Sequence, residues 1–331
     1  VLYGEKPSLS ASKIEDFNSC KYSFFIKHGL KAKPLKTTGI DAPEFGTLMH
    51  YVLERVSREA ASRGGFGKTS SDDIKYFAAV FTDAYAEERL KYSLTNARFA
   101  FLFDKLRTEV ADMVAFIAAE LASSKFEPSE FEFNVRGEFG GVPLSGIIDR
   151  VDAMKLGDTL FVRVADYKTG SREFSLSDVY YGLGIQMLVY LFAYSAFNGS
   201  SKPAGVYYTP AKDILVSAAT RPTDELIAKE RKSKLKGSGL ILEGLSEEKI
   251  GKLVSAEQLG RLGRYVEETL MNISAAITCG EIEPDPFQRP NGRSPCDYCD
   301  FIAICGGADK RKLLTLKDNA VWEKIGEPVN R

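Results

Sequence analysis

The hydrophobic pattern of this chain changes its period between residues 122 and 130, and that change restricts the possible folds most strongly. Apolar residues recur at the spacing of amphipathic helices in 46–61, 72–94 and 98–122. Strand-length segments follow at 130–139, 142–153 and 160–167, separated by Gly-Gly and Gly-Asp turns. The sequence therefore predicts helices followed by a three-strand meander, which is an α/β or α+β plan and not a repeat protein.

The segments on either side of this region are less regular. Residues 8–30 have near-helical spacing, with Ser10 or Ser12 as the N-cap and Cys20 on or beside the helix. After the meander we expect a helix at 179–198, strands at 206–209 and 214–218, and helices from residue 223 to the Cys-rich end. The basic run at 229–236 is expected to be a solvated loop, with contact to a phosphate backbone as the alternative.

Charge and hydropathy exclude several classes of protein. The 44 Lys and Arg balance 45 Asp and Glu, so the field of the whole molecule does not attract nucleic acid. The longest strongly apolar run, 185–197, is shorter than the roughly 20 residues that span a bilayer, and no secretory signal opens the chain. We expect a cytoplasmic protein that does not insert into membranes. Because it begins with Val1, it is either a piece of a longer chain or a stand-alone protein.

The five cysteines are distributed too unevenly for a disulfide framework. One lies near the start at Cys20, and three lie near the end in a C-x2-C-x5-C arrangement, at Cys296, Cys299 and Cys305. Such short spacings allow thiolates to converge on a metal ion or a cluster. Spacing alone leaves a four-thiolate zinc site open. Cys279, at the end of a helix, is expected to be an ordinary buried thiol.

Acidic and basic side chains gather on two neighbouring predicted strands. Asp166 and Lys168 project from the same face of one strand because strand side chains alternate. Asp149 lies near the end of the neighbouring strand and could meet Asp166 across the pair. Two carboxylates so placed suit a hard divalent cation such as Mg²⁺ or Mn²⁺. The lysine can then orient water or offset charge on a phosphate. Gln186 and Tyr190 are four apart on a helix and face the same way.

This pattern resembles the PD-(D/E)xK nuclease superfamily. Phe45-Gly-Thr-Leu-Met-His50 is similar to the Gly-x3-His segment of its RecB-like branch, and Gln186-x3-Tyr190 to the Q-x3-Y helix of that branch. Leu9 to Cys20 and the closing C-x2-C-x5-C are similar to the split cysteine set of the iron–sulfur subgroup. Within it, the order of motifs and the helical insertion most resemble the C-terminal nuclease domain of the AddB subunits of bacterial AddAB helicase–nucleases.

The resemblance implies a fold and a set of site residues. The fold would be a restriction-endonuclease-like core, a small mixed sheet flanked by helices. His50, Asp149, Asp166 and the main-chain carbonyl of Tyr167 would bind the catalytic Mg²⁺ or Mn²⁺. Lys168 would be the catalytic lysine, with Gln186 and Tyr190 holding the lysine or a phosphate oxygen. A [4Fe-4S] cluster stapling the two ends of the chain would be held by Cys20, Cys296, Cys299 and Cys305.

The resemblance also implies a function. We expect one RecB-like nuclease domain over residues 1–331, with a helical insertion at about 72–122 and a cluster-binding segment at about 280–310. It would be an exonuclease on single-stranded DNA delivered by an AddA-like helicase partner, in double-strand-break repair and recombination. Two alternatives stay open: an iron–sulfur nuclease of CRISPR adaptation, and a catalytically silent DNA-binding or scaffold domain with a nuclease fold.

Overall fold

The computed structural model describes residues 2–4, 6–33, 42–89, 97–168, 173–210, 237–245 and 251–326. At Lys168, the last residue of a strand, it describes the backbone and not the side chain. The strand expected at 214–218 and the basic run at 229–236 lie outside the described residues.

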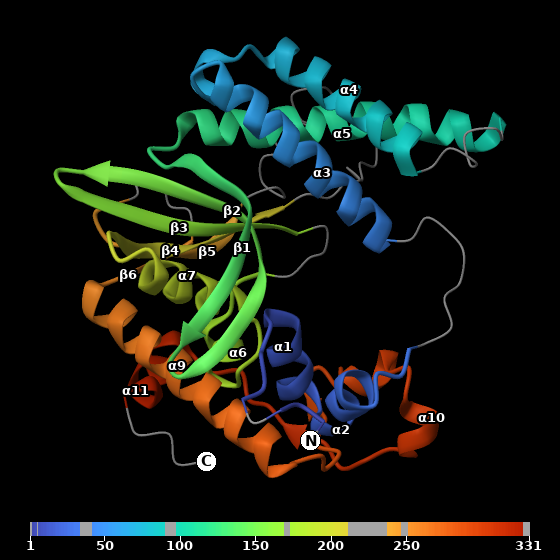
Figure 1. Ribbon diagram of the computed structural model, residues 1–331, viewed down its shortest axis with the longest axis vertical. Coiled ribbons are helices and arrows are strands. Elements are labelled where there is room, and N and C mark those ends of the chain that lie inside the picture. The colour runs from blue at the N-terminus through green and yellow to red at the C-terminus, as the bar shows by residue number, and fades with distance from the viewer. Residues whose placement is uncertain are drawn as a thin grey trace.

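A mixed sheet forms the centre of the described structure (Figure 1). Its six strands are β1 (Glu127–Phe139), β2 (Val142–Leu156), β3 (Thr159–Lys168), β4 (Ser201–Pro210), β5 (Ser238–Leu242) and β6 (Lys252–Val254), in that spatial order. The first three strands are antiparallel, and β4 runs parallel to β3. Farther out, β5 is antiparallel to β4 and β6 is parallel to β5. The predicted meander and the predicted small mixed sheet are confirmed.

Helices cover both faces of this sheet (Figure 1). On one side lie α3 (Ala42–Ser62), α4 (Ser71–Arg89) and α5 (Ala97–Ser123), with the 3₁₀ turn η2 (Phe66–Lys68) after α3. On the other lie α6 (Leu176–Tyr180), α7 (Gln186–Phe197), α9 (Ala256–Cys279) and α11 (Asp318–Ile325). The expected helices at 46–61, 72–94 and 98–122 correspond to α3, α4 and α5.

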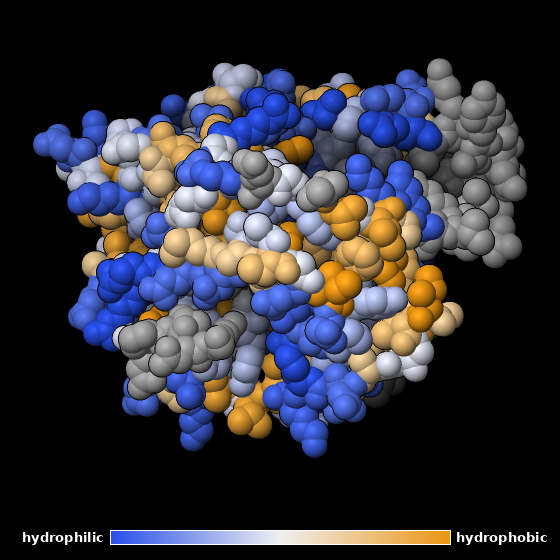
Figure 2. All heavy atoms as spheres, turned by 60° about the horizontal axis from the view of Figure 1, so that its bottom comes forward, coloured by the Kyte–Doolittle hydropathy of each residue, from blue (hydrophilic) through white to orange (hydrophobic). Residues whose placement is uncertain are grey.

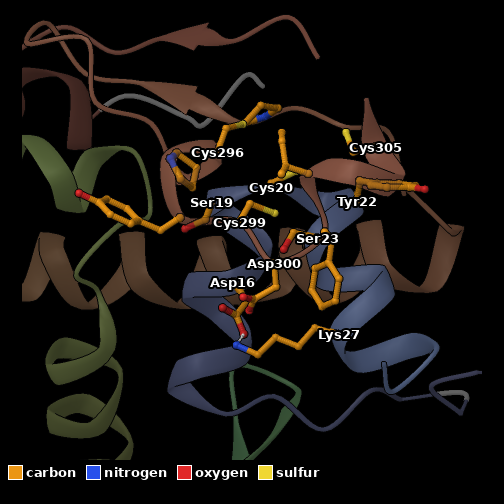
Figure 3. Close-up of a pocket in the computed structure, with 15 residues that line it drawn as sticks. Asp16, Ser19, Cys20, Tyr22, Ser23, Lys27, Cys296, Cys299, Asp300 and Cys305 are labelled. Carbon is orange, nitrogen blue, oxygen red and sulfur yellow. Dashed lines mark hydrogen bonds and ion pairs between the residues drawn. The ribbon is translucent and has the colours of Figure 1, made fainter. Parts of the chain in front are cut away.

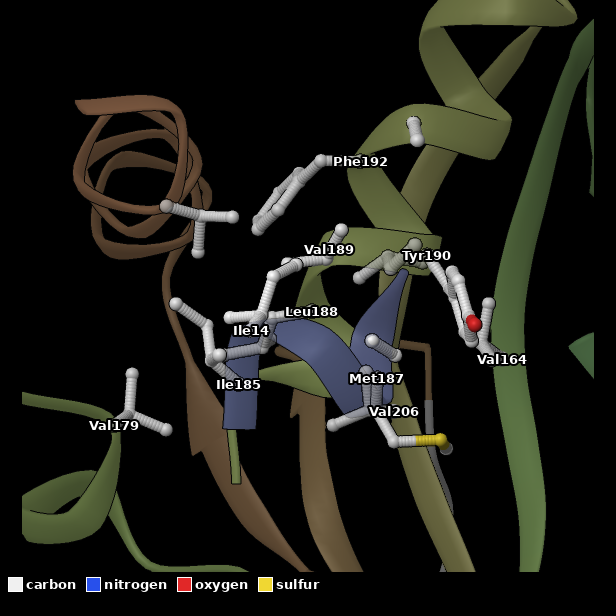
Figure 4. Close-up of a cluster of buried hydrophobic side chains, with 14 of the residues drawn as sticks. Ile14, Val164, Val179, Ile185, Met187, Leu188, Val189, Tyr190, Phe192 and Val206 are labelled. Atoms are coloured by element: carbon white, nitrogen blue, oxygen red, sulfur yellow. The ribbon is translucent and has the colours of Figure 1, made fainter. Parts of the chain in front are cut away.

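The largest hydrophobic core lies between the sheet and α7 (Figure 4). Eight consecutive residues of this helix, 187–194, are buried, so α7 is covered on all sides. A helix that is apolar all round belongs in the interior. The packing fixes Tyr190 against β2 and β3, while Phe192 points towards α9.

The N-terminal helices pack beside the C-terminal segment. They are α1 (Ala11–Ser19), α2 (Lys21–Phe24) and the π-helical turn η1 (Phe25–Gly29), beside β7 (Phe287–Gln288), η3 (Pro295–Tyr298), α10 (Ile302–Cys305) and β8 (Arg311–Lys312). Ser10 accepts a hydrogen bond from the Lys13 amide and is the N-cap of α1, as predicted. The Lys21 amide donates to Asp285, so hydrogen bonds already join the two ends.

The face of the molecule that carries these ends is mixed in character. Figure 2 shows hydrophilic and hydrophobic residues interspersed over it, with hydrophobic residues gathered towards one side. Ile302 and Ile304 of α10 are 41% and 69% exposed. Such exposure of single apolar residues is ordinary for a globular protein.

Three sequence expectations are wrong. Helices do not run unbroken from residue 223, because β5 and β6 intervene before α9. The single helix expected at 179–198 is two helices, since Gly182 and Gly184 between them have φ of +71° and +64°. Cys279 is exposed and not buried, because it ends α9 just before the left-handed C-cap Gly280.

Candidate functional site

Three carboxylates form a row across neighbouring strands. In the register of β2 with β1, the pairs Phe131–Arg150 and Phe133–Ile148 flank Glu132 and Asp149. The register of β2 with β3 ends at the pair Arg150–Ala165, and Asp149 and Asp166 come directly after that pair on the two strands. Like charges directly opposite one another on a sheet are destabilising. Asp166 is only 7% exposed, so solvent screens its charge weakly. A cation among these side chains would remove the repulsion.

His50 of α3 reaches this row from the helical side. Its Nδ1 lies 3.3 Å from Asp149 Oδ2. One ligand atom each from His50, Glu132 and Asp149 all lie within 4.8 Å of one another. Within the described residues this is the one group of three or more His, Cys, Asp or Glu gathered so closely. Imidazole and carboxylate ligands suit Mn²⁺ and, for the carboxylates, Mg²⁺.

The ionisation of this group reflects its burial and its charges. Burial lowers the pKa of His50, but the hydrogen bond to Asp149 and the charges of Asp149, Asp166 and Glu132 outweigh it, so the pKa is raised. Burial, with the charges of Asp149 and Glu54, raises the pKa of Glu132. The carboxylates repel one another here, and His50 relieves part of that repulsion.

Glu132 was not predicted from the sequence. Its backbone lies in the left-handed region, with φ of +47°, which is uncommon for a residue other than glycine. It follows a register shift between Pro128 and Glu130, and such irregularities re-aim side chains near functional sites. One signal was available: Glu132 and Asp149 stand equally far from the Gly140-Gly141 turn, so the hairpin pairs them.

A buried ionic network lies on the opposite face of β2 and β3. Arg150 is fully buried and donates to both oxygens of Asp152, at 2.6 and 3.1 Å, and to the Tyr167 hydroxyl at 2.6 Å. Arg163 donates to Asp152 at 2.8 Å. Burial alone would raise the pKa of Asp152, but these two guanidinium groups lower it. The network fixes the two strands that carry Asp149 and Asp166.

Tyr167 connects that network to His50. Its ring lies edge-on to the imidazole, with centroids 5.6 Å apart. The side chain of Tyr167 therefore faces α3. Its backbone lies between those of Asp166 and Lys168 on β3. Lys168 ends β3, where its backbone pairs with Pro210 of β4.

Tyr190 of α7 approaches the row from the other side. A Cβ added at Gly146 would lie 2.2 Å from the Tyr190 hydroxyl, so only glycine fits beneath it. Burial raises the pKa of Tyr190, and the charges of Asp149 and Asp166 raise it further. Gln186 is the first residue of α7 and is half-buried; none of the described hydrogen bonds joins it to the carboxylate row.

Four of the five cysteines line one cavity (Figure 3). The cavity has a volume of about 300 Å³ and lies between α1, α2 and the C-terminal segment. The residues that contribute thiols to it are Cys20, Cys296, Cys299 and Cys305. Among the described residues, no three of these sulfurs lie within 4.8 Å of one another. The expected convergence on a single centre is therefore incomplete, although the four thiols do share one cavity.

Comparison with known proteins identifies the family. Residues 8–306 match the family model described as the PD-(D/E)XK nuclease superfamily. The chain belongs to this superfamily. The mixed sheet flanked by helices agrees with such a fold.

Curated relatives of this superfamily member carry one name, the B subunit of an ATP-dependent helicase/deoxyribonuclease. The chain is 30% identical over 99% of its length to the protein of that name from Acetivibrio thermocellus, and 29% identical to the one from Clostridium tetani. In each case the chain spans 33% of the relative. A solved structure from Eubacterium rectale has 13% identity over 76% of this chain and 90% of its own, with a TM-score of 0.30, a likeness too distant for comparing folds.

The described residues contain no helix that is long and apolar enough to cross a membrane.

Proposed function

We propose that this chain is a divalent-metal-dependent deoxyribonuclease whose site is the carboxylate row with His50. The row itself is the observation that carries the proposal. The imidazole of His50 and the carboxylates of Glu132 and Asp149 lie within 4.8 Å of one another and make a set of nitrogen and oxygen ligands that suits Mg²⁺ or Mn²⁺. Asp166 of the adjacent strand lies outside this group and is proposed as a further ligand.

The protein side chains have separate roles in this proposal. His50, Asp149 and Asp166 hold the metal, with the main-chain carbonyl of Tyr167, and Glu132 adds a carboxylate that the resemblance did not include. The metal, when bound, supplies Lewis acidity for phosphodiester hydrolysis. Lys168 is the catalytic lysine, which offsets charge on the phosphate. Tyr190, packed on Gly146, positions the strand that carries Asp149, and Gln186 at the start of α7 contacts the phosphate or the lysine.

Single-stranded DNA is the proposed substrate, and the proposed activity is an exonuclease fed by a helicase partner. The relatives named as parts of a helicase/deoxyribonuclease support the partner and the nucleic acid. The net charge of −1 supports delivery by a partner, because weak overall attraction to DNA leaves binding to a local groove. We further propose that residues 1–331 make one domain. One core contains residues from Leu9 to Ile325, and Tyr167 of β3 joins the sheet to a second core formed by α3, α4 and α5.

The cysteine cavity is proposed to hold a [4Fe-4S] cluster that joins the two ends of the chain. Zn–S bonds of about 2.3 Å put tetrahedral sulfurs roughly 3.8 Å apart, a tighter grouping than these thiols make. A four-iron cluster is wider than one ion, and its four ligands match the four cysteines that line the cavity. Cys279 is excluded because it lies on α9 and does not line this cavity.

The test is degradation of single-stranded DNA by the purified protein with Mg²⁺ and with EDTA. Wild-type protein should degrade it only with Mg²⁺, and Asp166→Asn and Lys168→Met should each lose most of the rate. Asp158→Asn, in the exposed turn at the other end of β3, is the matched control and should keep it. Equal rates in all four proteins would refute the site.

A further inference from the structure

A second cavity lies beside α7 and α9, and the carboxylate row does not line it. It has a volume of about 650 Å³, within the range of small-molecule sites. It is formed by α7 and α9, the C-terminal ends of β1 and β5, and the N-terminal ends of β3 and β4. Phe161 and Asp166 are five residues apart on β3, or about 16 Å along an extended strand. The cavity is therefore separate from the site described above.

Three phenylalanines lie in its walls. Phe139 of β1, Phe161 of β3 and Phe192 of α7 all line it. Phe192 points from α7 towards α9 in Figure 4. Aromatic faces in a groove stack on nucleobases, at about 1–3 kcal/mol per base.

Two buried hydroxyl groups in this wall lack hydrogen-bond partners. The Oγ atoms of Ser195 and Ser201 are buried and accept or donate no hydrogen bond among the described residues, and Ser201 is only 7% exposed. An unsatisfied buried hydroxyl costs about 1–3 kcal/mol. Neither Oγ atom has accessible surface, so a ligand in the cavity reaches them only when the serine side chains rotate towards it.

Two cations complete the lining. Lys202 and Arg264 line the cavity, and neither forms an ion pair within the described part of the chain. Glu267 is the one acidic residue of the lining, so its net charge favours an anion. Gly260, also in the lining, faces open space, because a Cβ built there meets no atom within 4 Å. Glycine inside a helix lowers helix stability by about 1 kcal/mol relative to alanine. At this position the absence of a side chain leaves room for a ligand.

We propose that this cavity binds a nucleoside monophosphate, either free or as the terminal nucleotide of a DNA strand. The base lies against Phe139 and Phe161, with the side chains of Ser195 and Ser201 rotated to hydrogen-bond to it, and the phosphate lies at Lys202 and Arg264. The site is a binding site only, and it does not depend on the catalytic assignment.

The test is calorimetric titration of the whole chain with dAMP in EDTA. Wild type and Asp166→Asn should bind dAMP equally. Gly260→Leu, which adds a bulky side chain at the cavity wall, and Lys202→Met with Arg264→Met, which removes the cations, should each bind at least about tenfold more weakly, as loss of one stacking or phosphate contact predicts. Gly260→Ala is the matched control and should bind as wild type does. The melting temperatures of Gly260→Ala and Gly260→Leu should be no lower than that of wild type.

Two further ligands identify the source of the nucleotide. A short 5′-phosphorylated oligonucleotide that binds more tightly than dAMP, with the same response to Gly260→Leu, assigns the site to a strand end; equal affinity assigns it to free nucleotide. Binding of inorganic phosphate as tight as that of dAMP would overturn the proposal. So would no binding of either nucleotide ligand, or dAMP binding that Gly260→Leu leaves unchanged. If dAMP binds as expected while the nuclease test fails, only the catalytic proposal falls.

Discussion

Replacing Arg150 with methionine tests how the active-site strands are held. The guanidinium of Arg150 is fully buried and makes three hydrogen bonds, two to Asp152 and one to Tyr167. Methionine would remove all three and leave Asp152, itself fully buried, with the single bond from Arg163 at 2.8 Å. Breaking a buried ion pair from one side costs about 3–5 kcal/mol, because the remaining charge stays buried. We expect Arg150→Met to lower the free energy of unfolding by that amount.

The assay is urea unfolding followed by circular dichroism, with the free energy taken from the midpoint and slope. Arg136→Met is the matched control, since Arg136 is exposed on β1, and it should change stability by less than about 0.5 kcal/mol. Arg150→Met should also weaken Mn²⁺ binding, because Asp149 precedes Arg150 on the same strand. A loss of stability below about 1 kcal/mol would show that the network does not hold these strands, and would refute the reasoning.

Three other predictions concern single positions. Gly146→Ala places a Cβ 2.2 Å from the Tyr190 hydroxyl and should lower the free energy of unfolding, measured in urea, by about 1–3 kcal/mol. Gly67→Ala is the control, because Gly67 lies in open space, and it should lower that free energy little. Equal effects would contradict the packing of Tyr190 on Gly146. Cys20→Ser should lower the melting temperature of anaerobically prepared protein more than Cys279→Ser, because Cys20 lines the cysteine cavity and Cys279 is exposed. Similar melting temperatures would contradict a cluster that joins the two ends of the chain. In metal-free protein the pKa of His50 is raised, so the ion pair of His50 with Asp149 stabilises the folded state fully below the unfolded pKa of about 6.5. This stabilisation is lost as the pH rises through the folded pKa. The melting temperature of His50→Gln in EDTA should therefore lie further below wild type at acid pH than at alkaline pH, and a gap that widens with pH would disprove this.

The elements that the sequence predicted are those whose signal is local. The three strands of the meander carry a period of two and are bounded by glycine turns, and the same period places Asp166 and Lys168 on one face. Opposition of Asp149 to Asp166 follows from the short turn between their strands. These features need only neighbouring residues.

What the sequence did not predict depends on contacts between distant residues. The hairpin register alone brings Glu132 next to Asp149, but the left-handed backbone of Glu132 is not signalled by its residue type. The short strands β5 and β6 exist because they pair with β4 and with each other, and so a prediction based on helical period missed them. Cys279 looked apolar in sequence, but its exposure is set by where α9 ends.

The central claim is that the carboxylate row with His50 binds a divalent metal, and Mn²⁺ titration tests it most directly. Wild-type protein should bind Mn²⁺ saturably. Asp149→Asn, which removes the carboxylate shared by both neighbours of the row, should weaken binding at least about tenfold, a loss of roughly 1.4 kcal/mol or more. Glu132→Gln should weaken it measurably, and Glu127→Gln, exposed on the same strand, should not. Mn²⁺ affinity that is the same in wild type and Asp149→Asn would contradict the account.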